Sequence, residues 1–558
     1  MRIAVISTLA SGGAASAAWC LTNALSEYGH DCSFFILESS DNPRQIPLLG
    51  NENAFWLPAS FKHWLSLTDP GALASHATEL FSDNLMSLHV SHDLPEFIQE
   101  AEVVNLHWVA GMLFSPALLS AIAGKKIVWT LHDENAFTGG CHYAGICQKY
   151  KSQCCDCPLL KKSGLDDLSS RCFELKKRLY PFLDAFFVTP SVWLAEEAKT
   201  SVLLRNYPVT TIPNPLDIKR FLPLQNKLDL RRKLGLPEDA FLILSGSAFL
   251  DNPRKNVKVL FDALELLSGD SPALPIELML YGYGKPPELA FIIHHFGYVV
   301  DEAAMAELYG VADLLIHTSL QENLALTLCE AQACGTPTLC FDVGGCSETM
   351  LPEKTGFLVT EMTCQALAEK LRAIIADRNS LVGMREAAHA FAFERFSPIT
   401  IAATYTEVFE KAQPAPGLKT SDPLFTELLQ NQIASLATLI QENDKEIDDR
   451  VNSVNSRIGE IEASTKQLDN RIGEIEAYIP RFENLVNGVN SRIGEIEAHV
   501  PRLENRINEI ETCITKFGSK IDEIKTQAEE QTKSLEQLRW NLRHPFRWFF
   551  NKFLKLIF

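Results

Sequence analysis

The stretch from residue 319 to 345, SLQENLALTLCEAQACGTPTLCFDVGG, constrains the fold more than any other part of the sequence. A short polar loop precedes a run of apolar residues with helical spacing, and the turn Gly335-Thr336-Pro337 leads into the apolar strand 338–341. Gly344 and Gly345 close the stretch. Because a helix and a buried strand follow one another here, the pattern predicts an α/β domain with a parallel sheet.

Two glutamates, Glu322 and Glu330, lie in this stretch with seven residues between them. Alone, such a pair is more often part of a solvated helix face, but the surrounding turn and strand favour a binding site. Glu330 follows Glu322 by about two helical turns and can reach ribose hydroxyls from the same helix. Between them lies the predicted helix N-terminus, whose unpaired N–H groups and partial positive charge suit a diphosphate. The residues that supply these N–H groups are Asn323, Leu324, Ala325 and Leu326.

Strands and helices alternate over two further regions. Residues 2–7, 16–28 and 31–37 predict strand, helix and strand, while 241–247 and 257–267 open a second series that includes a short strand at 297–299. The turn between the first strand and helix holds Gly12 and Gly13, which let a ligand approach the backbone closely. It lacks the complete dinucleotide fingerprint, which argues against NAD.

Polar residues follow the ends of three predicted buried strands, where α/β folds bind ligands. His107 ends one strand, and His132-Asp133 end the next. A lone histidine is more often structural, but two histidine-containing strand ends that converge favour a site. Arg254 and Lys255 lie between a strand end and a helix start, where cations are placed to bind phosphate.

At the Glu322–Glu330 stretch, and in HDENAFTGGCHY at 132–143, the sequence resembles the retaining GT-B glycosyltransferases of bacterial surface polysaccharide synthesis, the glycosyl transferases group 1 type. The resemblance covers roughly residues 1–412. It extends to TIPNPLD at 211–217, TGFLV at 355–359 and the Arg254-Lys255 pair, although the family glycine after that pair is Asn256 here.

The resemblance implies two Rossmann-like domains that face a cleft, and we place them at 1–212 (the acceptor side) and 213–390 (the nucleotide-sugar side), with a helix at 391–412 that crosses back. It implies that Arg254 and Lys255 neutralise the departing diphosphate, that Glu330 binds the ribose and that Glu322 binds the donor sugar. Gly12 and Gly13 would close on the diphosphate, and His132 would contact the donor sugar or the acceptor. Such enzymes need no cofactor, because fixed cations do the electrostatic work.

The expected function is therefore that of a retaining glycosyltransferase, a hexosyltransferase, which moves a sugar from a nucleotide-diphosphate sugar to a polysaccharide or lipid-linked glycan. Two alternatives stay open. One is a catalytically inactive GT-B scaffold that acts as a coiled-coil assembly protein, and the other is a nucleotide-sugar phosphorylase or epimerase on the same fold.

Five of the fourteen cysteines crowd into seventeen residues. Their spacing is compatible with a structural zinc knuckle, with unligated thiols, or with a redox or disulfide pair. A reducing compartment disfavours disulfides, and nothing else in the sequence points to a catalytic metal. The predicted zinc ligands are Cys141, Cys147, Cys154 and Cys157.

The C-terminal quarter differs in composition from the rest. A predicted linker at 413–430 precedes RIGEIEA at Arg457, Arg471 and Arg492 and RINEIE at Arg506, all spaced by multiples of seven. This heptad repeat predicts a coiled coil over 431–540. Isoleucine at both core positions favours three or four chains, and arginine before glutamate at the flanking positions favours parallel strands. The alternative is a single helix that folds back on its own enzyme.

The last residues, 541–558, combine arginines and lysines with aromatic residues and contain no acidic residue. They suit the interface of an anionic membrane surface, and docking on a protein partner is the alternative. The net charge of −19 argues against nucleic-acid binding. Because no run reaches the ~18–20 apolar residues of a membrane span, we expect a cytoplasmic protein, peripheral at the inner face of the cytoplasmic membrane.

Overall fold

The computed structural model describes residues 1–8, 12–36, 45–47, 81–82, 94–267, 275–430, 480–485, 488, 512 and 515–516. The chain divides into two compact units, 1–50 with 58–428, and 51–57 with 429–558. In the second unit the few described residues are helical. The predicted coiled coil at 431–540 and the tail at 541–558 therefore lie almost wholly outside the described residues.

The first unit contains two parallel sheets, and the N-terminal one has seven strands. Ile3 and Val5 of its inner strand β1 (Arg2–Ser7) face one layer of helices, whereas Ala4 and Ile6 face the other, as the two-residue period of a strand requires. Both faces are thus covered, which explains the nearly continuous apolar runs. The strands lie in the order β3 (Gln45–Pro47), β2 (Asp31–Ile36), β1 (Arg2–Ser7), β4 (Val103–Leu106), β5 (Lys126–Thr130), β6 (Phe186–Thr189) and β7 (Val209–Thr211).

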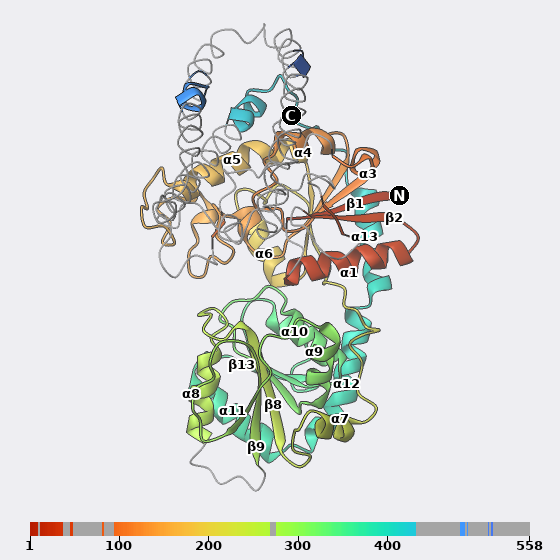
Figure 1. The fold of residues 1–558 in the computed structure, drawn as a ribbon, viewed down its shortest axis with the longest axis vertical. Coiled ribbons are helices and arrows are strands. Elements are labelled where there is room, and N and C mark those ends of the chain that lie inside the picture. The colour runs from red at the N-terminus through yellow and green to blue at the C-terminus, as the bar shows by residue number, and fades with distance from the viewer. Residues whose placement is uncertain are drawn as a thin grey trace, which may run out of the picture. The chain divides into compact units, whose positions relative to one another are not determined.

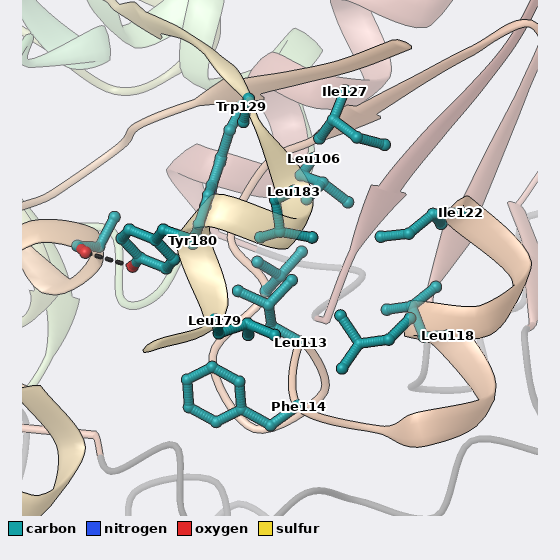
Figure 2. Close-up of a cluster of buried hydrophobic side chains, with 14 of the residues drawn as sticks. Leu106, Leu113, Phe114, Leu118, Ile122, Ile127, Trp129, Leu179, Tyr180 and Leu183 are labelled. Atoms are coloured by element: carbon teal, nitrogen blue, oxygen red, sulfur yellow. Dashed lines mark hydrogen bonds between the residues drawn. The ribbon is translucent and has the colours of Figure 1, made fainter. Parts of the chain in front are cut away.

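Helices cover both faces of this sheet. One face packs against α1 (Gly13–Glu27) and α13 (Pro398–Lys411). On the other face, side chains of α4 and α5 share a core with those of β4 and β5, as Figure 2 shows for Tyr180 of α5 and Trp129 of β5, whose ring centroids are 5.6 Å apart. The same core includes Tyr180, whose hydroxyl donates to the carbonyl of Ala136. The elements of this second layer are α3 (Glu96–Glu100), α4 (Pro116–Ile122), α5 (Leu168–Leu183), α6 (Val192–Thr200) and the short helices η1 (Asn135–Phe137) and η2 (Lys149–Lys151).

The second sheet has six parallel strands and is also covered on both faces (Figure 1). One core contains α8 (Val257–Leu267) and α11 (Cys364–Ala376), and the other contains α9 (Glu302–Val311), α10 (Leu326–Ala333) and α12 (Ser380–Arg395). Two further helices are α7 (Lys227–Lys233) and η3 (Cys346–Thr349). The strand order is β10 (Ile292–His295), β9 (Ile276–Tyr283), β8 (Phe241–Phe249), β11 (Leu314–His317), β12 (Thr338–Phe341) and β13 (Gly356–Val359). The prediction of two doubly wound α/β folds is confirmed.

Three local details differ from the predictions. The strand expected at 297–299 lies instead at Ile292–His295. The helix expected at 391–412 is two helices, because Pro398 lacks an N–H and starts α13 after the break that follows α12. Residues 413–428, expected as a linker, pack on the first domain through the buried side chains of Leu418, Leu424 and Leu428.

Among the helices that the structure describes, none combines the length and apolar character needed to cross a bilayer.

Candidate active site

The strand order reverses between β1 and β4 in the first sheet and between β8 and β11 in the second. In open α/β sheets, ligands bind outside the carboxyl ends of the strands at these switch points. Arg254 and Lys255 follow β8, and Glu322 follows β11. The second switch point therefore brings Glu322 to two adjacent cations that precede it by 68 and 67 residues.

Hydrogen bonds to backbone carbonyls join the two loops that carry these residues. The N–H of Leu320 donates to the carbonyl of Arg254 over 2.8 Å, and the hydroxyl of Thr318 donates to the carbonyl of Lys255 over 3.0 Å. The Glu322 side chain is only 8% exposed and accepts a hydrogen bond from Arg254 Nη1 over 3.0 Å. Lys255 Nζ binds the same carboxylate oxygen.

The charges of this cluster do not cancel. Burial alone would raise the pKa of Glu322, but Lys255, His317 and Arg254 together hold it well below its usual range. Burial lowers the pKa of His317, whose Nε2 lies 3.4 Å from the carboxylate, so this ring is neutral at pH 7. Two cations facing one carboxylate leave surplus positive charge, which suits an anionic ligand.

Asn256, directly after the two cations, has a left-handed backbone with φ of +49°. Glycine adopts this conformation at no steric cost, and asparagine is among the few other residues that do so readily. The asparagine therefore preserves the turn for which the resembling family uses glycine.

The N-terminus of α10 faces the same region without a capping side chain. In the described part of the chain, the backbone N–H groups of Leu324, Ala325, Leu326 and Thr327 donate to no protein acceptor. Unpaired donors and the partial positive charge of a helix end make such a place suitable for an anion.

Glu330 lies one helical turn further along α10. Its Oε2 accepts a hydrogen bond from the Tyr309 hydroxyl of α9 over 2.8 Å. Burial raises the pKa of Glu330 to about 7, and the Tyr309 hydrogen bond opposes that rise. The carboxylate thus has one oxygen engaged and is poised between its charged and neutral forms.

Gly344 and Gly345 hold the loop that bears Glu322. A Cβ at Gly344 would lie 1.8 Å from the Glu322 carbonyl oxygen, and one at Gly345 would lie 1.9 Å from that of Asn323. Only glycine lets the two backbone segments approach so closely. The closing glycine pair of the sequence motif therefore sets the position of the glutamate.

The first domain contributes its own helix N-terminus. Gly12, with φ of +90°, precedes α1, which starts at Gly13. A Cβ at Gly13 would lie 3.7 Å from Leu326 Cδ1 at the start of α10. The glycine turn thus approaches the N-terminus of α10, as expected for a loop that closes on a bound anion.

His107 and His132, at the ends of β4 and β5, are brought together by the structure. His107 Nδ1 lies 2.8 Å from His132 Nε2. Burial lowers the pKa of His132 to about 4. Burial, with His132 as neighbour, also holds the pKa of His107 well below its usual range. Both rings are therefore neutral at pH 7.

Asp133 is engaged within the protein. It accepts hydrogen bonds from His142 Nδ1 over 2.6 Å, from Trp108 Nε1 over 3.1 Å and from the N–H of Asn135 over 2.8 Å. Burial opposes its ionisation, but His142 and the other donors hold its pKa below the ordinary value. Its position is better suited to orienting Trp108 and His142 than to direct contact with substrate.

Asn323 connects the two domains through its side chain. Its Oδ1 accepts from the Ser191 hydroxyl over 2.6 Å, and its Nδ2 donates to the His132 carbonyl over 3.1 Å. The Glu348 carboxylate accepts from the N–H groups of Val192 and Trp193 over 2.8 and 3.0 Å, in the first turn of α6. Both contacts hold the loops of the two domains against each other.

The predicted zinc ligands, with Cys155, line one small cavity. Cys154 Sγ accepts a hydrogen bond from the N–H of Gly139 over 3.2 Å. The thirteen cysteines that the structure describes are all free thiols, and within the described residues no three potential ligands are arranged to hold a metal ion. The thiols as placed do not form a coordination group, so structural zinc stays a prediction, which metal analysis of the full chain would test.

Sequence reasoning missed several side chains at this site. The Arg254 guanidinium lies 4.8 Å over the ring of Tyr143, and Glu348 and His317 were also overlooked. Tyr143 belongs to the HDENAFTGGCHY segment, which gave a usable signal. Glu348 gave none, because its partner helix lies more than 150 residues away in the sequence.

Residues 241–377, which contain Arg254, Lys255, Glu322 and Glu330, match the family described as glycosyl transferases group 1. The chain is 31% identical over 221 residues to the D-inositol 3-phosphate glycosyltransferase of Geodermatophilus obscurus, covering 37% of this chain and 48% of that protein. It is 30% identical over 241 residues to the enzyme of the same name from Streptomyces scabiei, covering 39% and 52%. The chain spans about half the length of the curated relatives it matches.

Among solved structures, a sucrose-phosphate synthase from Thermosynechococcus elongatus is similar over 73% of this chain and 98% of its own, with 17% identity and a TM-score of 0.47. Anabaena HepE in complex with UDP-glucose is similar over 73% of this chain and 99% of its own, also with 17% identity and a TM-score of 0.47.

Proposed function

We propose that this protein is a retaining glycosyltransferase that moves a sugar from a nucleotide-diphosphate sugar to a polysaccharide or lipid-linked glycan. The observation that carries the proposal is the convergence of Arg254 and Lys255 on the buried Glu322 carboxylate, beside the open N-terminus of α10. The match of residues 241–377 to group 1 glycosyl transferases, and the relatives named as glycosyltransferases, support it.

In this proposal the donor diphosphate takes the place that Glu322 occupies as counter-ion of the two cations. Arg254, Lys255 and the N–H groups of α10 stabilise the negative charge that builds on the leaving diphosphate. Glu322, released from the cations, accepts hydrogen bonds from the donor sugar, and Glu330 accepts from the ribose. The acceptor attacks from the face that the diphosphate leaves, so retention needs no enzyme nucleophile.

The test is a thermal-shift screen of GDP, UDP, ADP and their sugar conjugates on four proteins: the wild type, Lys255→Ala, Glu330→Ala and Lys258→Ala. Lys258 is the matched control, because its side chain is 79% exposed and pairs with Asp262. One nucleotide should stabilise the wild type and the control, by about 2.7 kcal/mol at a hundred times its Kd. The two site variants should lose this stabilisation. No shift with any nucleotide would overturn the proposal.

The heptad repeat favours a second candidate function, that of a catalytically inactive GT-B scaffold. Acceptor-dependent release of nucleoside diphosphate by the wild type distinguishes the transferase from this scaffold, and also from a phosphorylase or epimerase. If the protein binds a nucleotide sugar but does not cleave it into sugar and nucleoside diphosphate, the scaffold would be favoured.

We further propose that residues 431–540 assemble the enzyme into a trimer or tetramer and that the basic, aromatic tail at 541–558 holds it on an anionic membrane surface. The support is the sequence pattern alone. Light scattering and co-sedimentation with anionic vesicles would compare the full chain with residues 1–430. An unchanged oligomer size and unchanged vesicle binding in the shorter chain would contradict the proposal.

A further inference from the structure

A series of buried hydrogen bonds leads from α13 through the centre of the first sheet to His132. The Tyr405 hydroxyl lies 3.0 Å from Thr130 Oγ1, which accepts from Asn105 Nδ2 over 3.1 Å. Asn105 Oδ1 lies 2.9 Å from His107 Nε2, and His107 Nδ1 lies 2.8 Å from His132 Nε2. Asn105 is fully buried on β4, in a strand whose other residues are apolar.

The orientation of the Asn105 amide is fixed by a backbone carbonyl. Asn105 Nδ2 lies 3.0 Å from the carbonyl oxygen of Val128, which can only accept a hydrogen bond. Turning the amide over would place Asn105 Oδ1 against the Val128 carbonyl oxygen, so that two acceptors would face each other in the core. Asn105 Oδ1 is therefore the atom that faces His107.

This orientation decides where the protons of both histidines lie. Since Asn105 Oδ1 accepts, His107 Nε2 must carry the proton, and because the ring is neutral its Nδ1 must be an acceptor. His132 Nε2 must then donate to that atom. His132 is neutral as well, so its one proton lies on Nε2 and its Nδ1 has a free electron pair.

The remaining nitrogen of His132 is available to a ligand. Among the residues that the structure describes, His132 Nδ1 has no hydrogen-bond partner. It is also not one of the fully buried polar atoms without a partner, so a ligand can reach it. The two rings are 23° from parallel with centroids 5.1 Å apart, as for imidazoles joined edge to edge, so His107 also fixes the direction of the His132 ring.

We infer that Asn105 and His107 are positioning residues that hold His132 in the tautomer with an unprotonated Nδ1, which accepts a hydrogen bond from a hydroxyl of the bound sugar or acceptor. An acceptor-only nitrogen recognises a hydroxyl and does not bind a phosphate or carboxylate oxygen, which also only accepts. The hydroxyl as ligand rests on the proposed function, whereas the tautomer rests on the structure alone.

Magic-angle-spinning NMR of the sedimented full chain, labelled with nitrogen-15 in the histidine rings, tests the tautomer directly. His132→Gln identifies the His132 signals. At pH 7 the wild type should show an unprotonated Nδ1 and a protonated Nε2 for His132. In His107→Leu, which removes the acceptor, His132 should become a mixture of tautomers.

His107→Gln is the conservative variant, because its amide can donate to Asn105 and its carbonyl can accept from His132. It should keep the wild-type tautomer. Thr130→Val is the matched control. It removes a different hydrogen-bonding group of the same buried network, the Thr130 hydroxyl, but leaves the Val128 carbonyl to orient Asn105. It should destabilise the protein and leave the His132 signals unchanged.

Kinetics then separate positioning from folding. His107→Leu should lower kcat by about tenfold to a hundredfold, by analogy with partners that orient a metal-bound histidine through its second nitrogen. His107→Gln and Thr130→Val should retain most of the activity. Nucleotide stabilisation in the thermal-shift screen should persist in all three variants, because the cation cluster is untouched.

Two results would overturn the inference: a proton on His132 Nδ1 in the wild type, or unchanged His132 signals in His107→Leu. Absence of turnover in the wild type would instead count against the proposed function. The NMR result would still stand, because it needs no substrate.

Discussion

At the scale of single residues, Asn256 shows how one backbone angle restricts the choice of amino acid. Its positive φ costs an ordinary L-residue about 1 kcal/mol or more. Asn256→Gly should therefore leave the free energy of unfolding nearly unchanged, and Asn256→Ala should lower it by about 1 kcal/mol. Urea unfolding of the three proteins measures both effects. Equal stability of the alanine and glycine variants would mean that the turn relaxes.

Glu330 should give stability a characteristic pH dependence. Its pKa rises from an ordinary 4.5 to about 7, so between these values the folded protein keeps a proton that the unfolded chain has released. Its contribution to the free energy of unfolding therefore falls as the pH rises through this window. In thermal unfolding at pH 5 and pH 8, the melting temperature of Glu330→Gln relative to that of the wild type should be higher at pH 8 than at pH 5.

The matched control for this pH effect is Glu307→Gln, because Glu307 lies on the neighbouring helix with its side chain 40% exposed. Its difference from the wild type should be the same at both pH values. A constant difference for Glu330→Gln as well would show that the carboxyl titrates normally in the folded protein.

Part of the site follows from the sequence at this scale, because strand ends in a parallel sheet share one edge. That logic anticipated the proximity of His107 and His132, whereas a shared site for Arg254, Lys255 and Glu322 was implied only by the family resemblance. It could not anticipate that Glu322 neutralises part of the cation charge or that Asn105 orients His107. Those facts depend on which atoms meet across strands, and the sequence pattern records only which face a residue occupies.

At the scale of elements, α6 has an unusual N-terminal partner. Its first two N–H groups are bound by Glu348 of the other domain, and Arg395 lies 3.7 Å from that carboxylate. A carboxylate at a helix N-terminus stabilises the unpaired donors and the positive helix end. Glu348→Ala should therefore lower the free energy of unfolding by about 1 kcal/mol.

The measurement is urea unfolding of Glu348→Ala beside Glu361→Ala, an exposed glutamate of the same domain. The Glu361 variant should match the wild type. If the two variants lose the same small amount, the contact across the domains contributes nothing beyond ordinary surface charge.

The prediction of helices and strands succeeded where the apolar run was long and failed where it was short. The strands of both sheet centres are continuous apolar runs and were placed well. Strand β10 was missed because none of its side chains is fully buried and two of its four residues are His294 and His295. The break before α13 was missed although Pro398 marks it, because the flanking residues keep a helical period.

At the scale of the whole molecule, the first domain ends later than the predicted boundaries suggest. Leu418, Leu424 and Leu428 are at least 95% buried in its core, and each buried leucine stabilises by about 2 kcal/mol. A chain of residues 1–430 should therefore fold with a melting temperature close to that of the full protein. A chain of residues 1–412 should melt at clearly lower temperature or aggregate.

Differential scanning calorimetry of the two truncated chains makes this comparison. Similar melting temperatures for 1–412 and 1–430 would mean that the segment after α13 adds little. Its hydrogen bonds with the first domain, such as that from the N–H of Ala415 to the carbonyl of Lys125 over 2.7 Å, argue otherwise.

The packing of α13 onto β1 has a consequence for how the chain is made. Ile3 and Val5 share a core with Ile401 and Tyr405, so a segment that leaves the ribosome early must wait for one that is synthesised after the whole second domain. At roughly 5–20 residues per second, the delay is on the order of half a minute. The contiguous second domain can close during that time, while the part of the first sheet that α13 covers stays exposed. Of the two domains that the structure describes, the one whose strands are synthesised first is completed last, and it is there that a nascent chain would most need a chaperone.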